Sequence, residues 1–232
     1  MTASYELEYL LGRGGGGRVF RARQKSTGQA VAVKLLDLEP ELGTSARQRR
    51  KERFRREMKI CARLDHPDVV GLIDYGEDGD ELYSVFELVS GRTLTQVLQD
   101  DRALTVARTL SLVRKLLEVL VHAHGLGVIH RDLKPSNIMV LGERDDARIK
   151  VLDFGISTMS SAGAGAAPTR LTLSNEVVGT PAYAAPEQLR GDAPTTKTDL
   201  YALGLITLEC LTGRNEMAGN SLGEIFQRQL AP

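Results

Sequence analysis

The chain has little cysteine, no excess of either charge and no long apolar run, and each shortage excludes a class of protein. Its two cysteines, Cys61 and Cys210, form neither a CxxC motif nor a cysteine and histidine spacing suited to zinc. We therefore expect free, at least partly buried thiols in a reducing compartment, with a disulfide as the less favoured alternative. Thirty basic and thirty acidic side chains cancel, so no net field attracts nucleic acid or an anionic membrane.

The sequence also lacks a segment typical of a membrane span or an export signal. Charges or glycines interrupt every apolar stretch before it reaches the roughly 18 residues that a transmembrane helix needs. Glu6 and Glu8 stand where a signal peptide would carry basic and then unbroken apolar residues. We expect a cytoplasmic protein with no membrane span in this chain.

The first part of the chain has the pattern of a small sheet with one helix. Short apolar segments such as 30–33 alternate with Gly-rich or polar turns, which favours strands. A long helix is expected from about Ser45, its N-cap, to Leu64, because a proline follows closely. Further strands are expected at 69–75 and 81–86.

Beyond Ser90-Gly91 the apolar residues recur at helical spacing. One expected helix ends near 125–127, and a second runs from about 196 to 211. The first carries an apolar stripe of Val106, Leu110, Val113, Leu117 and Leu120, and the second carries Leu203, Ile206, Cys210 and Leu211 on one side. Segment 157–168 is rich in Ser, Ala and Gly and is expected to be mobile.

Two motifs in the helical part carry groups that phosphoryl transfer can use. Residues 130–137 read His-Arg-Asp-Leu-Lys-Pro-Ser-Asn, and residues 153–155 read Asp-Phe-Gly. An acid can deprotonate a hydroxyl, an amide oxygen and a second carboxylate can share magnesium, and a lysine can follow the moving phosphoryl group. The two motifs together resemble the catalytic loop and magnesium motif of eukaryotic-type (Hanks-type) Ser/Thr protein kinase catalytic domains, especially bacterial ones.

The resemblance covers nearly the whole chain and implies an α+β, two-lobed kinase fold. The small lobe would be residues 1–88, with an antiparallel sheet and one helix, the hinge 89–92, and the mainly helical large lobe 93–232. The resemblance also implies ATP and Mg²⁺ as cofactors. It assigns Asp132 as the orienting base, Lys134 as the group that stabilises the transferred phosphoryl charge, and Asn137 and Asp153 as magnesium ligands.

Residues 12–19 fit the GxGxxGxV pattern of a phosphate-binding loop between two strands. Glycines let the backbone approach phosphates and supply amide donors. A plain flexible turn is the alternative, which the family spacing to Ala32-Val33-Lys34 disfavours. Gly16 departs from the large residue found at the loop tip in many relatives, so the loop is expected to cover ATP loosely.

By resemblance, Lys34 holds the α and β phosphates and pairs with a helix glutamate. Glu57 matches the family spacing, and Glu52 is the alternative. Both glutamates could also be solvated charges on a strongly basic helix.

The resemblance further implies a set of nucleotide contacts. Phe86 would be the gatekeeper, Glu87 and Val89 would offer backbone groups to the adenine edge, and Val19, Ala32 and Met139 would sandwich its faces. The full set of nucleotide-binding residues is Leu11, Gly12, Gly14, Gly17, Val19, Ala32, Lys34, Phe86, Glu87, Val89 and Met139. The apolar members could equally be ordinary core.

Lys134 and residues 179–187, Gly-Thr-Pro-Ala-Tyr-Ala-Ala-Pro-Glu, resemble the form found in kinases that act on serine or threonine. Thr180 would bridge Asp132 and Lys134. Protein substrates, rather than nucleic acid, are therefore the expected partners.

The span 153–187 would be an activation segment. Its hydroxyls at Ser157, Thr169, Thr172 and Ser174 are candidate sites of self-phosphorylation, which would need transient self-association. Ordinary solubilising hydroxyls are the alternative.

Three other features stand beside this interpretation. A metal site at His122, His124 and His130 is not favoured, because His130 is expected to pack against Phe154. The arginine that usually pairs with Glu187 is absent, and loss of one partner of a buried pair can cost roughly 3 to 5 kcal/mol.

The chain also stops where the family normally continues through two or more helices. We therefore expect either an active Ser/Thr protein kinase or a catalytically impaired nucleotide-binding or regulatory module. A small-molecule phosphotransferase is a weaker third candidate.

Overall fold

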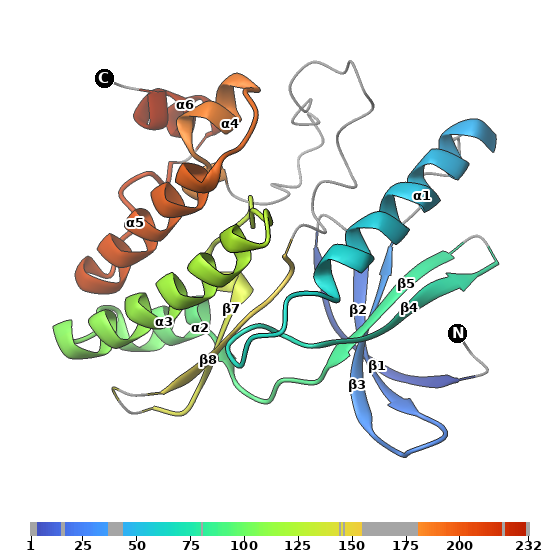
Figure 1. Ribbon diagram of the computed structural model, residues 1–232. Coiled ribbons are helices and arrows are strands. Elements are labelled where there is room, and N and C mark those ends of the chain that lie inside the picture. The colour runs from blue at the N-terminus through green and yellow to red at the C-terminus, as the bar shows by residue number, and fades with distance from the viewer. Residues whose placement is uncertain are drawn as a thin grey trace. The chain divides into compact units, whose positions relative to one another are not determined.

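The computed structural model describes residues 4–14, 17–36, 44–79, 81–143, 145, 147–154, 181–219 and 221–230 (Figure 1). These residues fall into two compact units. The first contains the described residues up to Asp65 and those from Val70 to Val89, and the second contains 66–69 and the described residues from Ser90 onward. Strands dominate the first unit and helices the second, which confirms the expected α+β class.

The first unit is built on an antiparallel five-stranded sheet of order β1-β2-β3-β5-β4. The strands are β1 (Tyr5–Gly14), β2 (Gly17–Gln24), β3 (Ala30–Leu36), β4 (Leu72–Asp78) and β5 (Glu81–Glu87). Alternate side chains point to opposite faces, so Val31, Val33 and Leu35 enter one core cluster together with Tyr5 and Val85. The opposite face carries Lys34 and Leu36.

Helix α1 (Thr44–Cys61) packs on this second face, where its Phe54 and Met58 are fully buried against Leu36 and Leu82. The predicted end of the helix at Leu64 is wrong by three residues. The amides of Arg63 and Leu64 bond to carbonyls three residues back, which is a tighter turn than an α-helix. The strand predicted to start at 69 starts at Leu72 instead.

The second unit combines helices with a three-stranded sheet of order β6-β7-β8. Its helices are α2 (Leu94–Asp101), α3 (Val106–Gly125), α4 (Pro186–Arg190), α5 (Thr196–Thr212) and α6 (Leu222–Leu230), with 3-10 turns η1 (Pro135–Asn137) and η3 (Pro181–Tyr183). The strands are β6 (Arg92–Thr93), β7 (Ile138–Leu141) and β8 (Arg148–Val151). Helices α3 and α5 pack against each other (Figure 1). The η1 turn ends at Asn137, directly before β7.

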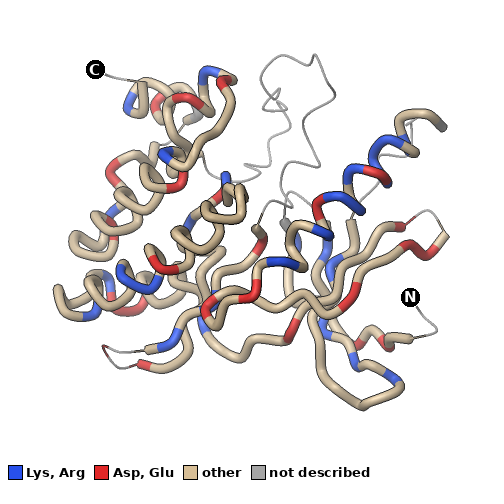
Figure 2. Tube along the Cα trace, viewed as in Figure 1, with Lys and Arg blue, Asp and Glu red and all other residues tan. Residues whose placement is uncertain are grey.

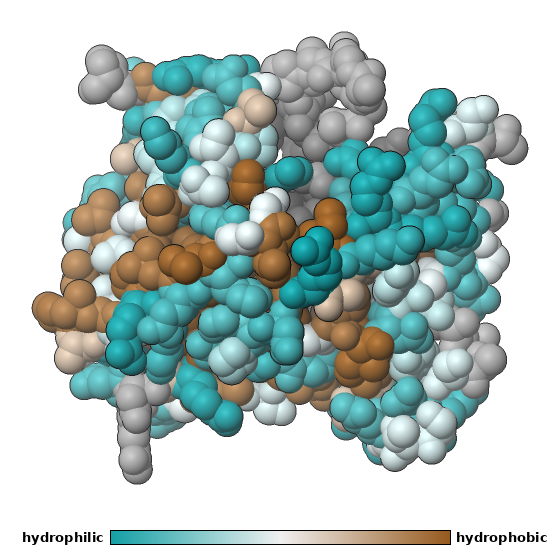
Figure 3. All heavy atoms as spheres, viewed as in Figure 1, coloured by the Kyte–Doolittle hydropathy of each residue, from teal (hydrophilic) through white to brown (hydrophobic). Residues whose placement is uncertain are grey.

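The apolar stripe predicted on α3 is largely wrong. Val106 and Leu110 are 64% and 63% exposed, and Leu117 is 40% exposed. Apolar side chains gather over α3 on the visible surface (Figure 3). The buried face consists of Thr109, Leu112, Leu116, Val119, Leu120 and Ala123. On α5, Leu203, Ile206 and Cys210 are buried as predicted, whereas Leu211 is exposed.

The two cysteines are free, and Cys210 is buried while Cys61 is half-buried, which confirms their interpretation as thiols. Among the described helices, none has the length and apolar character that a membrane crossing requires. The segment predicted to be mobile, 157–168, lies outside the described residues.

Candidate active site

The loop between α3 and β7 brings two of the predicted site residues, Lys134 and Asn137, to a third, Asp132. Lys134 Nζ donates to both oxygens of Asp132, at 3.0 Å and 2.8 Å. Asn137 Nδ2 donates to the Asp132 carbonyl at 2.8 Å and lies 3.3 Å from its Oδ2. Asp132 is therefore held by a cation and an amide while its side chain keeps 39% of its surface exposed, which leaves it open to an incoming group.

Asp199, in the first turn of α5, holds this loop through hydrogen bonds to its backbone. The sequence did not predict this role. Its side chain is 1% exposed. It accepts from the backbone amides of His130 and Arg131, each at 2.9 Å, and lies 2.7 Å from His124 Nε2. An acid in the first turn of a helix is usually explained by the helix dipole, so the sequence alone did not distinguish Asp199 as a residue that holds this loop.

His130 forms the core of the loop. Its side chain is fully buried, its ring lies 4.6 Å from that of Phe154, and its Nε2 lies 2.9 Å from the Leu152 carbonyl. The predicted packing against Phe154 is thus confirmed. Within the described residues no group of three or more His, Cys, Asp or Glu side chains could hold a metal ion.

Two residues beside the loop have backbone conformations that non-glycine residues rarely adopt. Arg131 has φ +68° and Asp153 has φ +58°. Such residues cost about 1 to 3 kcal/mol each and persist where neighbouring contacts hold them. For Arg131 those contacts are the Asp199 bond to its amide and a bond of 2.8 Å from Gln188 Nε2 to its carbonyl.

Asn137 and Asp153, the predicted magnesium ligands, both lie in the second unit at the ends of the β7–β8 pair. The Leu152 amide bonds to the Asn137 carbonyl at 2.8 Å, which ties the residue before Asp153 to Asn137. The Asn137 amide nitrogen is used by Asp132, so its amide oxygen is the atom left for a ligand. An amide oxygen and a carboxylate suit Mg²⁺, which prefers oxygen and usually takes only one or two protein carboxylates.

The first unit places four of the predicted nucleotide residues on one face of its sheet. Val19 lies opposite Lys34, and Ala32 lies opposite Phe86, in the register of β2, β3 and β5. Directly opposite residues of antiparallel strands share a face. Lys34 is 8% exposed, so its ammonium is largely withdrawn from water.

Helix α1 covers the same face, and its two glutamates, the acids predicted as partners of Lys34, differ in exposure. Glu57 lies between the buried Phe54 and Met58 and its side chain is 15% exposed, whereas Glu52 is exposed and bonds to Gln48. Glu57 Oε1 accepts from Arg53 Nε at 3.0 Å. The ion pair between Glu57 and Lys34 stays a prediction.

The glycine-rich turn contains glycines with different local needs. Gly17 has φ +139°, and a Cβ there would lie 1.9 Å from the Leu35 carbonyl oxygen, so only glycine fits. A Cβ at Gly12 would meet no atom within 4 Å. Gly14 pairs with Gly17 at the end of the β1–β2 hairpin, and Leu11 on β1 is 46% exposed. Gly16, the expected loose loop tip, lies outside the described residues.

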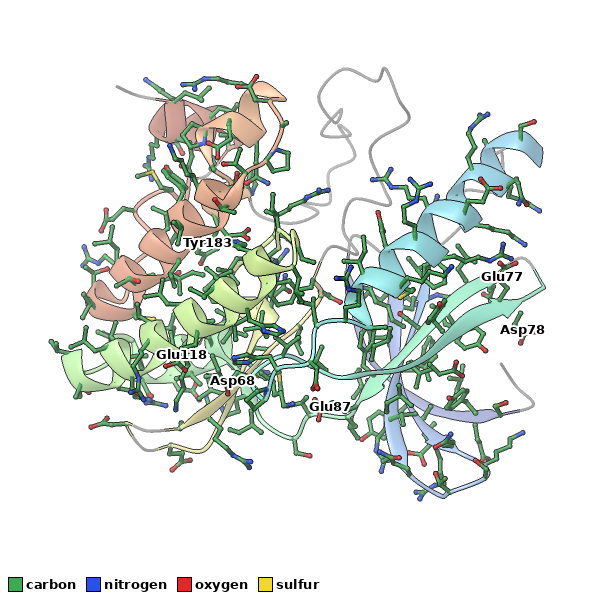
Figure 4. The ribbon with its side chains drawn as sticks, viewed as in Figure 1. Asp68, Glu77, Asp78, Glu87, Glu118 and Tyr183 are labelled. Atoms are coloured by element: carbon green, nitrogen blue, oxygen red, sulfur yellow. The ribbon has the colours of Figure 1, made fainter. Side chains whose placement is uncertain are left out.

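The last predicted nucleotide residues are Glu87 at the end of β5, Val89 two residues beyond it, and Met139 on β7. The Glu87 amide bonds to the Gly71 carbonyl and its side chain accepts from the Gly71 amide at 2.8 Å, so among its backbone groups only the carbonyl could serve a base (Figure 4). Val89 is half-buried. Met139, in the second unit, is half-buried on β7 opposite Lys150.

The described part of segment 179–187 begins at Pro181, because Thr180 lies outside the described residues. The candidate phosphosites lie outside them as well. Gln229 on α6 is 3% exposed, and its Nε2 donates to the Ala182 carbonyl at 2.9 Å. Tyr201 donates in turn to Gln229. No sequence signal singled out Gln229.

A second anchor of this segment is the bond from the Tyr183 hydroxyl to Glu209 Oε2, at 2.5 Å. Burial raises the pKa of both groups above the usual range. Glu187, which we expected to be without its usual arginine, accepts from the buried Thr198 hydroxyl at 2.7 Å. This hydroxyl gives Glu187 one hydrogen bond but no counter-charge, and the cost of the absent arginine stays a prediction.

Comparisons with known proteins agree with this arrangement. A family profile described as protein kinase domain matches residues 5–231. The chain is 43% identical over 213 residues to serine/threonine-protein kinase pkn3 of Myxococcus xanthus, covering 90% of this chain and 38% of that protein. It is 34% identical over 230 residues to serine/threonine-protein kinase PrkC of Bacillus subtilis, covering 99% and 34%. It is 36% identical over 221 residues to the probable serine/threonine-protein kinase PknB of Corynebacterium glutamicum, covering 94% and 32%. The chain thus spans about a third of the length of these relatives.

Proposed function

Because the chain belongs to the protein kinase domain family, we propose that it transfers the γ-phosphoryl group of ATP to serine and threonine hydroxyls of proteins. The observation that carries the proposal is the arrangement around Asp132. A partly exposed carboxylate bonded by Lys134 and backed by Asn137 is what a hydroxyl acceptor and a moving phosphoryl group require.

The chain's own residues would act as follows. Asp132 orients the substrate hydroxyl and accepts its proton. The hydroxyl oxygen forms a bond to the γ-phosphorus while the bond from that phosphorus to the bridging oxygen breaks, so ADP leaves. Lys134 stabilises charge on the transferred group, and Thr180 bridges Asp132 and Lys134.

Asn137 and Asp153 are the residues that would hold magnesium, with oxygen atoms that suit this ion. When bound, Mg²⁺ neutralises charge on the phosphate oxygens. Asn137 also holds the Asp132 carbonyl, so its substitution would disturb the base as well as the metal site.

Residues of the first unit, together with Met139, would bind ATP. Lys34, supported by Glu57, would hold the α and β phosphates, and the backbone of the glycine-rich turn would cover them. The remaining contacts to the nucleotide would come from Leu11, Gly12, Gly14, Gly17, Val19, Ala32, Phe86, Glu87, Val89 and Met139. The structure limits Glu87 to its carbonyl and makes Gly17 necessary for the hairpin itself.

Regulation and location complete the proposal. Self-phosphorylation at Thr169, Thr172 or Ser174, through transient self-association, would add a phosphate group that cationic side chains can bind. Mass spectrometry after incubation with ATP tests this, and a segment 153–187 without phosphate contradicts it. The free thiols support a reducing, cytoplasmic location.

The transfer itself is tested with labelled ATP, magnesium and a generic basic protein acceptor. Asp132→Asn is expected to lower the rate by about 10²- to 10⁴-fold, the usual contribution of a positioned base. Asp192→Asn, which alters an exposed carboxylate on the same unit, serves as the matched control and is expected to keep full activity. Equal label in the wild type and Asp132→Asn contradicts the assignment of Asp132. Label in neither favours a non-catalytic module.

A further inference from the structure

Gln229 is a buried polar side chain that has no part in the proposed reaction. It lies in the last turn of α6 and is 3% exposed. The nine residues of this helix also include one acid and one base (Figure 2), the half-buried Glu224 and the exposed Arg228. An amide that leaves water is costly unless its oxygen and its nitrogen find partners. The partners of Gln229 therefore indicate what its burial serves.

Both ends of the Gln229 amide are bonded. Its Nε2 donates to the Ala182 carbonyl at 2.9 Å, and its oxygen accepts from the Tyr201 hydroxyl. Tyr201 lies on α5, two residues after Asp199, the carboxylate that holds the catalytic loop. Helix α6 packs against the turn η3, to which Ala182 belongs. One side chain thus links α6, α5 and η3.

The Ala182 carbonyl needs a donor from the protein. Ala182 is 0% exposed, so water does not reach it. The preceding carbonyl, that of Pro181, accepts from the Ala184 amide at 2.9 Å and closes the turn, whereas the Ala182 carbonyl accepts from Gln229. A buried carbonyl that loses its donor keeps the cost of its lost hydration without compensation. Removal of the Gln229 amide would therefore favour a shifted Ala182.

The segment that Gln229 holds is also tied to the catalytic loop. Gln188 on α4 accepts from the Ala185 amide at 3.0 Å and donates to the Arg131 carbonyl at 2.8 Å. Helix α4 contacts α6 and lies beside it (Figure 1). A shift of residues 181–185 would therefore change their position relative to Asp132, the residue that follows Arg131.

We propose that Gln229 is a positioning residue for the protein acceptor. It fixes the Ala182 carbonyl and thereby segment 181–185, against which the acceptor chain would lie. This role rests on the proposed function, because segment 179–187 is the part of the chain assigned to the acceptor. Since Gln229 acts through Ala182 and lies outside the set assigned to ATP, its loss should weaken use of the acceptor and leave use of ATP unchanged.

A side chain that only stabilises the fold would give a different kinetic result. Its substitution would lower the fraction of folded enzyme, so kcat per mole of protein would fall while both KM values stayed the same. Substitution of a positioning residue raises the KM of the acceptor alone. The comparison of KM with kcat therefore separates the two roles.

The test variant is Gln229→Met, which keeps an unbranched side chain with a good helix propensity but has no amide. Kinetics with labelled ATP, magnesium and a generic basic protein acceptor should show the acceptor KM raised by about fivefold to tenfold. The KM for ATP should stay within about twofold of the wild type. Gln227→Met, at an exposed position of the same helix, is the matched control and should change neither KM.

Tyr201→Phe removes only the hydroxyl that donates to the Gln229 oxygen. The amide nitrogen can still reach Ala182, so the acceptor KM should rise less than in Gln229→Met. Urea unfolding checks that each variant is folded. Equal acceptor KM values in Gln229→Met and the wild type overturn the proposal. So does a fall in kcat with both KM values unchanged, or a larger effect of Tyr201→Phe than of Gln229→Met.

Hydrogen exchange measured by mass spectrometry tests the same link without ATP or transfer. The Ala184 amide, which closes η3, should exchange about tenfold faster in Gln229→Met, while the amides of α3 keep their wild-type rates. Unchanged exchange over 182–185 overturns the proposal whether or not the chain transfers phosphate. If the wild type transfers no label, the proposed function fails, and faster exchange still supports the hold of Gln229 on this segment. The two failures are therefore distinguishable.

Discussion

Replacing Asp199 by asparagine keeps the shape of the side chain but removes its charge and one of its two acceptor atoms. In the native loop one carboxylate oxygen serves the Arg131 amide, and the other serves the His130 amide and His124. The amide of asparagine can replace only one of these oxygens. At least one backbone N–H would then face another donor in a site that is almost fully closed to water.

The loss of folding free energy caused by Asp199→Asn follows from these contacts. A hydrogen bond to a charged group contributes about 1.5 to 3 kcal/mol, and a buried donor left without a partner loses its hydration as well. Arg131 also holds a left-handed backbone that only its neighbours stabilise. We expect Asp199→Asn to lower the free energy of unfolding by about 2 to 3 kcal/mol. It should also lower kcat by about 100-fold, because the displaced backbone carries Asp132 with it.

Urea unfolding and phosphoryl-transfer kinetics measure the two effects separately, at a temperature where the variant is folded. Asp192→Asn is the matched control, because that side chain is exposed and the residue's backbone amide, which bonds to the Glu187 carbonyl, is unchanged by the substitution. The reasoning is refuted if Asp199→Asn unfolds within about 0.5 kcal/mol of the wild type and keeps more than about half of its kcat.

Three further predictions rest on local geometry and charge. Gly17→Ala should lower the free energy of unfolding by more than about 2 kcal/mol, because its Cβ would collide with the Leu35 carbonyl oxygen. Gly12→Ala should leave the free energy of unfolding unchanged, and equal urea midpoints for the two variants would contradict this prediction. At about pH 8 a thiol reagent should label Cys61 first and leave Cys210 until the protein unfolds, because burial raises the pKa of the Cys210 thiol to about 12, and fast labelling of both thiols would contradict it. The hydrogen bond from Lys51 lowers the pKa of Glu77. The ionised Glu77 therefore stabilises the fold at neutral pH, and this stabilisation is lost as the pH falls through the lowered pKa. Glu77→Gln should therefore melt below the wild type at about pH 7 and converge with it in acid, and a constant difference would argue against the ion pair.

The sequence predicted which residues meet in the loop better than it predicted the packing of the helices. Asp132, Lys134 and Asn137 are linked by bonds within six residues, and local spacing was enough to bring them together. The face of α3 was predicted wrongly because that helix is apolar on more than one side. Leu110 and Leu117 have the same helical spacing as the buried residues, so periodicity could not select between the faces.

Residues that act across long sequence separations were the hardest to predict. Gln229 contacts Ala182 from 47 residues away, and a buried glutamine near a chain end has no local pattern that distinguishes it from a surface one. The three-residue error at the end of α1 has another origin. A tight turn ends the helix before the proline does, and no single residue there signals that turn.

The long reach of Asp199 also has a consequence for the order in which the protein can mature during its synthesis. The residues that it holds precede it by 68 to 75 positions, so the ribosome makes the whole catalytic loop well before the carboxylate that shapes it. A nascent chain that has not yet extruded α5 would carry every residue needed for transfer without the geometry to perform it. The geometry needed for transfer would then form only after α5 has been synthesised and Asp199 has bonded to the loop.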